Sequence, residues 1–165
     1  MRTLPIFVFI GLLAAAGIFI ALLVADLPDV VAVHFDAAGR ADGFATREAS
    51  REFMLAFTLG TPMFVMLVTA LLPRVLPASM VNVPNRAYWL APERSRETLA
   101  YLSGHGTWFA CLLVIFLTVV AYLLVRANLT QPPVFPTRLL IAALLMLFAS
   151  IGVWALCMFR RFAMP

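Results

Sequence analysis

The sequence has no lysine, only two histidines, and four long stretches that contain no charged residue at all. These stretches run Leu4–Ala25, Phe53–Leu72, Gly106–Val125 and Leu139–Phe159. Ion-coupled carriers and proton pumps place ionisable groups inside the membrane, where such groups are costly and usually functional. An intramembrane hydrolase needs a base that activates its nucleophile. The lack of ionisable groups in all four stretches argues against both classes, and His105 lies only at the edge of the third.

What the sequence does have is apolar length. Hydrophobic residues make up 64% of the 165 positions, and charged residues only 12%. A bilayer core about 30 Å thick is crossed by ~20 apolar residues in a helix, and lipid requires each span to satisfy its own backbone hydrogen bonds. The chain is therefore predicted to be an all-α membrane protein, a four-transmembrane-helix bundle. It forms one integral domain over 1–165, with spans 4–25, 53–72, 106–125 and 139–159, and its partner is the lipid bilayer.

The first span is predicted to be a retained helix, because its apolar core is much longer than the about 7–15 residues of a cleaved signal peptide. With four spans, both termini lie on one side. The side with the termini has seven arginines: Arg2, Arg74, Arg86, Arg94, Arg96, Arg160 and Arg161. The other side has five: Arg40, Arg47, Arg51, Arg126 and Arg138. Cytoplasmic loops are the arginine-rich ones, so both termini are predicted to be cytoplasmic. The twelve arginines form no basic stripe, and nucleic-acid binding is not expected.

Within the spans, small residues and one proline indicate packing. Gly17, Ala21 and Ala25 repeat every fourth residue, and the fourth span has a comparable seam in Ala142, Ala149, Gly152 and Ala155. Such seams let helices approach closely within a bundle, and the same seam could serve a homo-oligomer. Pro62 in the second span predicts a kink. Cys111 and Cys157 are expected to be buried free thiols in a reducing compartment.

The outer loop, 26–52, is predicted to be folded. Val30–Asp36 alternates in polarity, with Val31, Val33 and Phe35 on one face, which indicates a short strand. Gly39 and the Asp42-Gly43 pair are turn signals. A helical lead-in to the second span is expected after them, with Thr46 or Ser50 as its N-cap.

The cytoplasmic loop, 73–105, is predicted to carry an amphipathic helix over Pro92–Leu102. Pro92 suits the first position of a helix, and Glu93 and Glu97 are spaced by four residues. This helix is expected to continue into the third span. Tyr88 and Trp89, just before it, suit the lipid headgroup layer.

His34, Asp36 and Asp42 are the candidate chemical site of the outer loop. An imidazole and two carboxylates could hold a divalent ion or form an acid/base site. They could also contact a peptide ligand. In the simplest interpretation, His34 bonds locally and the two carboxylates organise the turn. No cofactor is predicted, and the two histidines cannot share a metal because they lie on opposite sides of the membrane.

The loop resembles a bacterial membrane-protein family of unknown function, the domain of unknown function 1648. This domain also forms the N-terminal part of SdpI-type immunity proteins, which act against a sporulation-delaying toxin. The matching residues are Leu27, Pro28, His34, Phe35, Gly39, Asp42 and Gly43, and a second similar stretch contains Asn82, Pro84, Asn85, Tyr88 and Trp89. The chain departs from the family pattern at Ala32, Asp36 and Ala41, where relatives often have proline, asparagine and proline. It also looks shorter than the immunity proteins, without their extra C-terminal spans.

The resemblance implies a non-enzymatic protein of the bacterial inner membrane. Its outer loop would meet a membrane-active peptide or another envelope ligand, in immunity or in sensing. Two alternatives stay open from the residues. One is a metal-binding loop with an enzymatic or sensor role, and the other is an accessory subunit that assembles with a membrane transporter or regulator.

Overall fold

The structure is a computed structural model that describes residues 3–163. Arg2, one of the arginines used to predict sidedness, lies outside the described residues. The elements in chain order are α1 (Leu4–Val24), β1 (Val30–Phe35), β2 (Ala41–Thr46), α2 (Arg47–Met66), the π-helical η1 (Leu67–Leu71), α3 (Leu72–Val75), the 3-10 turn η2 (Ala78–Met80), α4 (Arg86–Trp89), α5 (Pro92–Asn128) and α6 (Thr137–Phe162).

Within residues 3–163, four helices are long and apolar enough to cross a membrane, as the sequence predicts. They comprise α1, the continuous helix Arg47–Val75, α5 and α6, with 21, 29, 37 and 26 residues. Two of them extend well beyond the predicted spans. The helix of the second span begins at Arg47, and the side chain of Thr46 caps it by accepting from the amide of Ala49 at 3.2 Å. The predicted amphipathic helix is confirmed as the first turns of α5.

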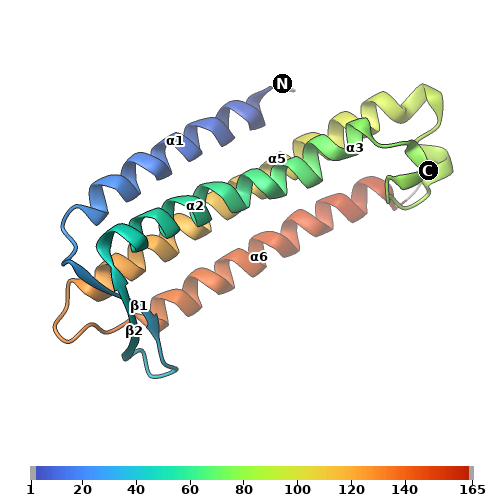
Figure 1. Cartoon of the computed structure of the whole chain (residues 1–165). Helices are drawn as coiled ribbons and strands as arrows, with labels where there is room; N and C mark the ends of the chain where they lie inside the picture. The colour runs from blue at the N-terminus through green and yellow to red at the C-terminus, as the bar shows by residue number, and fades with distance from the viewer. Residues whose placement is uncertain (1–2, 164–165) are drawn as a thin grey trace.

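The four helices do not form a closed bundle. α5 is central: α1 and α2 pack against it and against each other, whereas α6 makes its main helix contacts with α5 alone (Figure 1). The half-buried positions of α6 recur every three or four residues, at Leu140, Leu144, Leu147 and Ile151, so one narrow stripe touches α5. No residue in the most apolar window of α6 is fully buried.

Two predictions about small residues were wrong for this reason. Ala142, Ala149 and Gly152 are exposed rather than packed inside the bundle, and open space surrounds the position that a Cβ would take at Gly152. Cys157 is exposed on the same helix, although Cys111 is a buried free thiol as predicted. Ala142 and Ala149 line open cavities beside α5 and are not closed in by a neighbouring helix.

The second long helix departs from α-helical geometry at η1, which begins five residues after Pro62. α2 stays α-helical through the buried Pro62, and the π turn η1 ends two residues before Pro73. A proline ring clashes with the carbonyl four residues earlier, here that of Thr69, and a wider turn relieves the clash. The carbonyl of Ala70 in this turn accepts a hydrogen bond from Ser103, which in turn accepts one from Arg74 at 2.6 Å.

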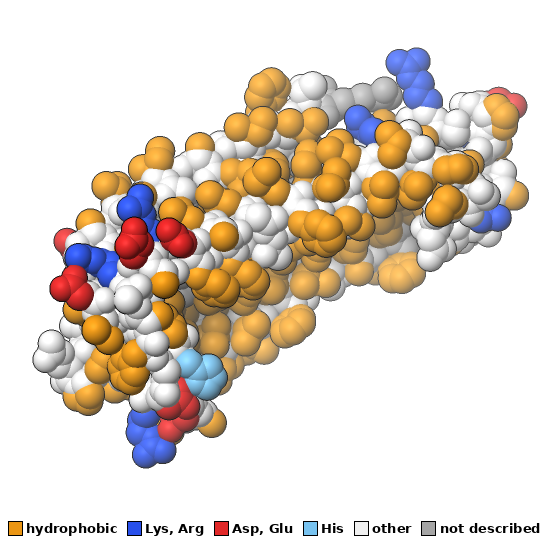
Figure 2. All heavy atoms as spheres, in the orientation of Figure 1, with side chains coloured by type: hydrophobic (Ala, Val, Ile, Leu, Met, Phe, Trp, Pro, Cys, Tyr) orange, Lys and Arg blue, Asp and Glu red, His pale blue; other side chains and the backbone are white. Residues whose placement is uncertain are grey.

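The β1–β2 hairpin and the C-terminal end of α6 lie at opposite ends of the molecule (Figure 1). On the face shown in Figure 2, charged side chains gather at the two ends, and the long middle section is mostly apolar. The architecture therefore presents a polar hairpin at one end of an apolar body, with the connection between α3 and α5 at the other end.

Candidate functional site

The base of the hairpin is fixed by a buried leucine and an arginine. Leu27 is 2% exposed and packs in a core cluster with Val24 and Val31. The guanidinium of Arg47 donates to the carbonyl of Leu27 at 3.0 Å and to the carboxylate of Asp29 at 2.9 Å. The Leu27-Pro28-Asp29 segment, which leads into the hairpin, is thereby attached to both α1 and α2.

The first strand is held on its other side by Asn128, at the end of α5. Its side-chain oxygen accepts from the amide of Ala32 at 2.7 Å, and its side-chain nitrogen donates to the carbonyl of Ala32 at 2.9 Å and to that of Leu124 at 3.0 Å. Both Ala32 and Asn128 are buried. The side-chain amide of Asn128 thus acts as a neighbouring strand would, because it bonds to the backbone N–H and C=O of Ala32, which would otherwise be buried without partners.

The turn between the strands is built by Asp36, Gly39 and Arg40. The carboxylate of Asp36 accepts from the amides of Ala38 and Arg40 at 2.9 and 2.8 Å and pairs with the Arg40 guanidinium at 2.8 Å. The backbone hydrogen bond from Arg40, followed by its side-chain bond, lowers the pKa of Asp36 below 3.8. Gly39 has a φ of +80°, and its missing Cβ would lie 2.8 Å from the carbonyl oxygen of Phe135.

This turn is attached to the start of α6. The amide of Phe135 donates to the carbonyl of Gly39 at 2.8 Å, and the rings of Phe35 and Phe135 are 5.2 Å apart. A backbone bridge between Arg40 and Val134 adds to this contact. The motif residues Phe35 and Gly39 therefore connect the hairpin to the loop before the last helix.

The second strand corrects one prediction. Asp42-Gly43 was expected to form a turn, but both residues lie within β2. Gly43 opposes His34 in the antiparallel register, and a Cβ at Gly43 would lie 2.8 Å from that of His34. The pairing is irregular between Ala32 and Phe35, so the predicted alternation of faces breaks there, and Val31 and Ala32 are both buried.

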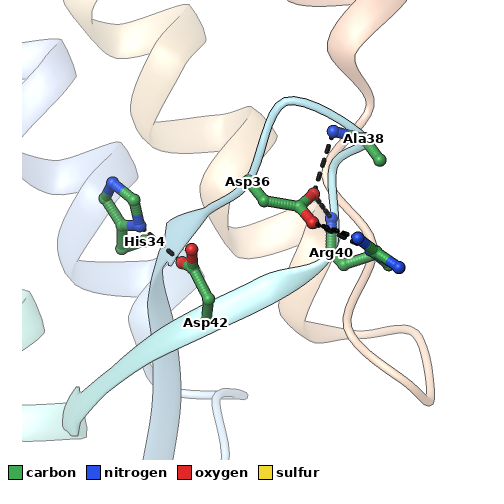
Figure 3. A network of polar contacts seen from close by, with 5 residues as sticks. All are labelled: His34, Asp36, Ala38, Arg40 and Asp42. Carbon is green, nitrogen blue, oxygen red and sulfur yellow. Dashed lines mark hydrogen bonds and ion pairs between the residues drawn. The ribbon is translucent and has the colours of Figure 1, made fainter.

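His34 and Asp42 form an exposed pair. Nδ1 of the imidazole contacts a carboxylate oxygen of Asp42, and the two side chains are 73% and 47% exposed. Figure 3 shows the carboxylate of Asp36 turned toward Arg40 and away from this pair. The hypothesis of a three-ligand metal site at His34, Asp36 and Asp42 lacks the required geometry, and nowhere in residues 3–163 do three metal-ligating side chains converge.

Two large apolar side chains of the hairpin are also exposed. Val30 is 63% exposed and Phe44 is 58% exposed. Asp42, Phe44 and Thr46 alternate along β2 and so share one face, and Thr46 opposes Val30 across the strands. We call this surface the hairpin face and define it as Val30, His34, Asp42, Phe44 and Thr46.

The second motif organises the opposite end of the molecule. Asn85 has a φ of +51°, precedes α4, and donates its side-chain amide to the carbonyl of Phe162 at 3.2 Å. Trp89 is buried and stacks edge-on against the ring of Phe162 at 5.4 Å. The motif therefore holds the C-terminal end of α6, whereas Asn82 and Pro84 are exposed on either side of the buried Val83.

Aromatic and arginine side chains complete this end. The guanidinium of Arg161 lies 4.4 Å from the centre of the Trp89 ring and pairs with Glu97 at 3.0 Å. Arg94 lies 4.0 Å above the ring of Tyr88. The headgroup-layer interpretation of Trp89 does not fit its burial, because its ring packs inside the protein.

Sequence reasoning missed the residues that place the hairpin. Asn128 and Arg47 carry most of its long-range hydrogen bonds, and Phe44 supplies an exposed aromatic ring. One signal was available for Asn128, a polar amide at the end of an apolar span, because such groups in or near lipid usually have a specific partner. Phe44 gave no signal, since one aromatic residue in a loop is common.

Residues 11–59 match the family model described as Domain of unknown function (DUF1648), which confirms the resemblance drawn from the loop. The match extends from within α1, across the whole hairpin, into α2. No curated protein and no solved structure matches the chain. The matched segment thus contains the hairpin face and the residues that attach it to the first two long helices.

Proposed function

We propose that this protein is a non-enzymatic, multi-pass protein of the bacterial inner membrane that contacts a membrane-active peptide through its hairpin face. The DUF1648 match and the four apolar helices support the membrane part of the proposal. The arginine count, seven at the end with the termini against five at the hairpin end, supports cytoplasmic termini and an outward-facing hairpin.

The exposed His34–Asp42 pair beside Phe44 carries the ligand part of the proposal. Most of the other motif side chains build the fold: Leu27 fills the core, and Phe35, Asp36 and Gly39 form and attach the turn. His34 and Asp42 are the motif residues whose functional groups remain accessible. Exposed aromatic and polar groups held on a rigid hairpin are suited to recognition, whereas catalysis favours sites that exclude water.

The charge of the loop favours a cationic peptide. Residues 26–52 contain six carboxylates and three arginines, which gives this segment a net charge of −3 with neutral histidine. Opposite charge increases the rate of encounter, and the apolar Val30 and Phe44 provide contact area for an amphipathic partner. We therefore expect a cationic amphipathic peptide to bind better than an anionic one of the same hydrophobicity.

The test uses the full chain in lipid nanodiscs and two synthetic amphipathic helical peptides, one of leucine and lysine and one of leucine and glutamate. We expect the lysine peptide to bind to wild type. His34→Ala and Phe44→Ala should each weaken this binding about tenfold. A tenfold change in Kd corresponds to a loss of about 1.4 kcal/mol of binding free energy, which is typical of an important interface residue. Val33→Ala, at an exposed hairpin residue outside the hairpin face, is the matched control.

Cells that produce the wild-type chain should also tolerate the lysine peptide better than cells that produce Phe44→Ala. Equal binding of both peptides, or equal effects of Val33→Ala and Phe44→Ala, would contradict the proposal. Yield and thermal melting of the variants separate lost binding from lost folding, because His34 and Phe44 are largely exposed.

The other hypotheses stay predictions. A role as an accessory subunit or a homo-oligomer would need a partner surface, and copurification in mild detergent would detect it. Metal analysis of the purified protein against His34→Ala would detect a metal bound by fewer than three side chains.

A further inference from the structure

An apolar groove runs along the seam between α5 and α6. It consists of two adjoining cavities of about 440 and 640 Å³ that share Leu112, Ile115 and Ser150. Val8 and Leu12 of α1 also line the larger cavity. Along α6 the groove extends from Leu139 to Trp154, which corresponds to about 22 Å of helix. The groove exists because α6 contacts α5 along only one narrow stripe, so the surfaces of the two helices beside that stripe stay uncovered.

Two arginines stand at the hairpin end of this groove. Arg126 follows the groove-lining Tyr122 by four residues, and Arg138 precedes the groove-lining Ala142 by four. Residues four apart lie on the same face of a helix, so both arginines continue the lining by one turn. Arg126 also donates to the hydroxyl of Tyr122 at 3.3 Å, which keeps it beside the groove.

Neither arginine has a carboxylate partner among residues 3–163. The ion pairs within 4.0 Å in this part of the chain are His34–Asp42, Arg40–Asp36, Arg47–Asp29 and Arg161–Glu97. Arg126 and Arg138 are both exposed. The apolar groove thus ends at two positive charges that no carboxylate within residues 3–163 neutralises.

We propose that this groove binds one anionic phospholipid of the leaflet at the hairpin end. Its acyl chain lies along α5 and α6, and its phosphate is held by Arg126 and Arg138. The two parts of the site match the two parts of such a lipid: the lining is apolar, and guanidinium groups form strong charge-assisted hydrogen bonds with phosphate. The proposal rests on the membrane location of the chain and not on a peptide role of the hairpin.

Charge argues against a second copy of the chain as the occupant. Two copies in one membrane share the same orientation, so a symmetric interface along this groove would bring two Arg126 and two Arg138 side chains to one end of it. Like charges placed together at an interface are unfavourable, whereas a phosphate neutralises them.

The test measures lipid retention by native mass spectrometry. The full chain is reconstituted with equal amounts of phosphatidylglycerol and phosphatidylcholine of identical acyl chains and is then extracted into detergent. We expect wild type to retain phosphatidylglycerol preferentially. The double variant Arg126→Gln/Arg138→Gln should lose about tenfold or more of this preference, since each basic side chain near an anionic surface contributes measurably to binding. Arg51→Gln, at an exposed arginine of the same end on α2, is the control and should keep the preference.

A second pair of variants tests the apolar part. Ala142→Phe fills the groove and should reduce retention of both lipids, whereas Ile141→Phe, on the outward side of α6, should not. Equal retention of the two lipids by wild type, or an equal loss in Arg51→Gln, would overturn the proposal. A dimer mass that Ala142→Phe abolishes would assign the groove to a second copy instead. Recovery of the chain in the soluble fraction would overturn the membrane location itself, whereas failed peptide binding would leave the lipid site standing.

Discussion

Asn128 offers a direct test of how the hairpin is attached. Replacing Asn128 by leucine keeps a similar shape but removes three hydrogen bonds, two of them to Ala32. Ala32 is 1% exposed, so its amide and carbonyl would both remain buried without partners. Each unsatisfied buried group costs about 1–3 kcal/mol, which gives about 2–6 kcal/mol for the two.

This cost should appear as local opening of the hairpin. Amide hydrogen exchange of the full chain in nanodiscs measures it at Ala32, where each 1.4 kcal/mol accelerates exchange about tenfold up to the unprotected rate. We therefore expect exchange at Ala32 to rise by roughly thirtyfold or more, with α1 and the middle of α5 unchanged. Asn82→Leu, at an exposed asparagine of the opposite end, is the matched control and should leave the hairpin unaffected.

Two results would refute this reasoning. Unchanged exchange at Ala32 in Asn128→Leu would show that the hairpin does not depend on the side-chain amide. Equal acceleration throughout the long helices would show that Asn128 supports the whole fold rather than one strand.

Two further predictions concern a close helix contact and the hairpin turn. Gly106→Ala would place a Cβ 2.8 Å from the backbone of Thr69 and should lower the free energy of unfolding by about 1–3 kcal/mol, measured by thermal or denaturant unfolding. Gly104→Ala, which has open space around its Cβ position, should be neutral or stabilising. Equal destabilisation by both variants would contradict the close contact between Gly106 and Thr69. The hydrogen bonds with Arg40 lower the pKa of Asp36. The stability that Asp36 adds to the turn is therefore fully present above its unfolded pKa of 3.8 and is lost as the pH falls through its lower folded pKa. NMR chemical shifts of the turn amides should titrate below pH 3.8 in wild type and stay constant in Asp36→Asn.

Much of the local structure could be predicted from the sequence, because it depends on neighbouring residues. Charge-free runs predict the four long helices, Thr46 is one of the two predicted caps of α2, and Pro92 predicts the start of α5. The alternation at Val30–Asp36 predicts the first strand, and the loop motif predicts the match of residues 11–59 to the family model. The second strand was missed because Asp42-Gly43 is a strong turn signal, and pairing with β1 overrode it.

The sequence alone determined that the chain has four membrane-length helices and a folded polar loop between the first two, since hydropathy and turn chemistry are local properties. The packing of the folded chain was needed to show that α6 touches α5 along one stripe, that Asn128 holds Ala32, and that His34 and Asp42 meet on the hairpin face. The physical reason is that a helix that is apolar on all sides gives no indication of which side meets protein and which meets lipid. Contacts between residues 96 positions apart, such as Asn128 and Ala32, leave no periodic pattern in the chain.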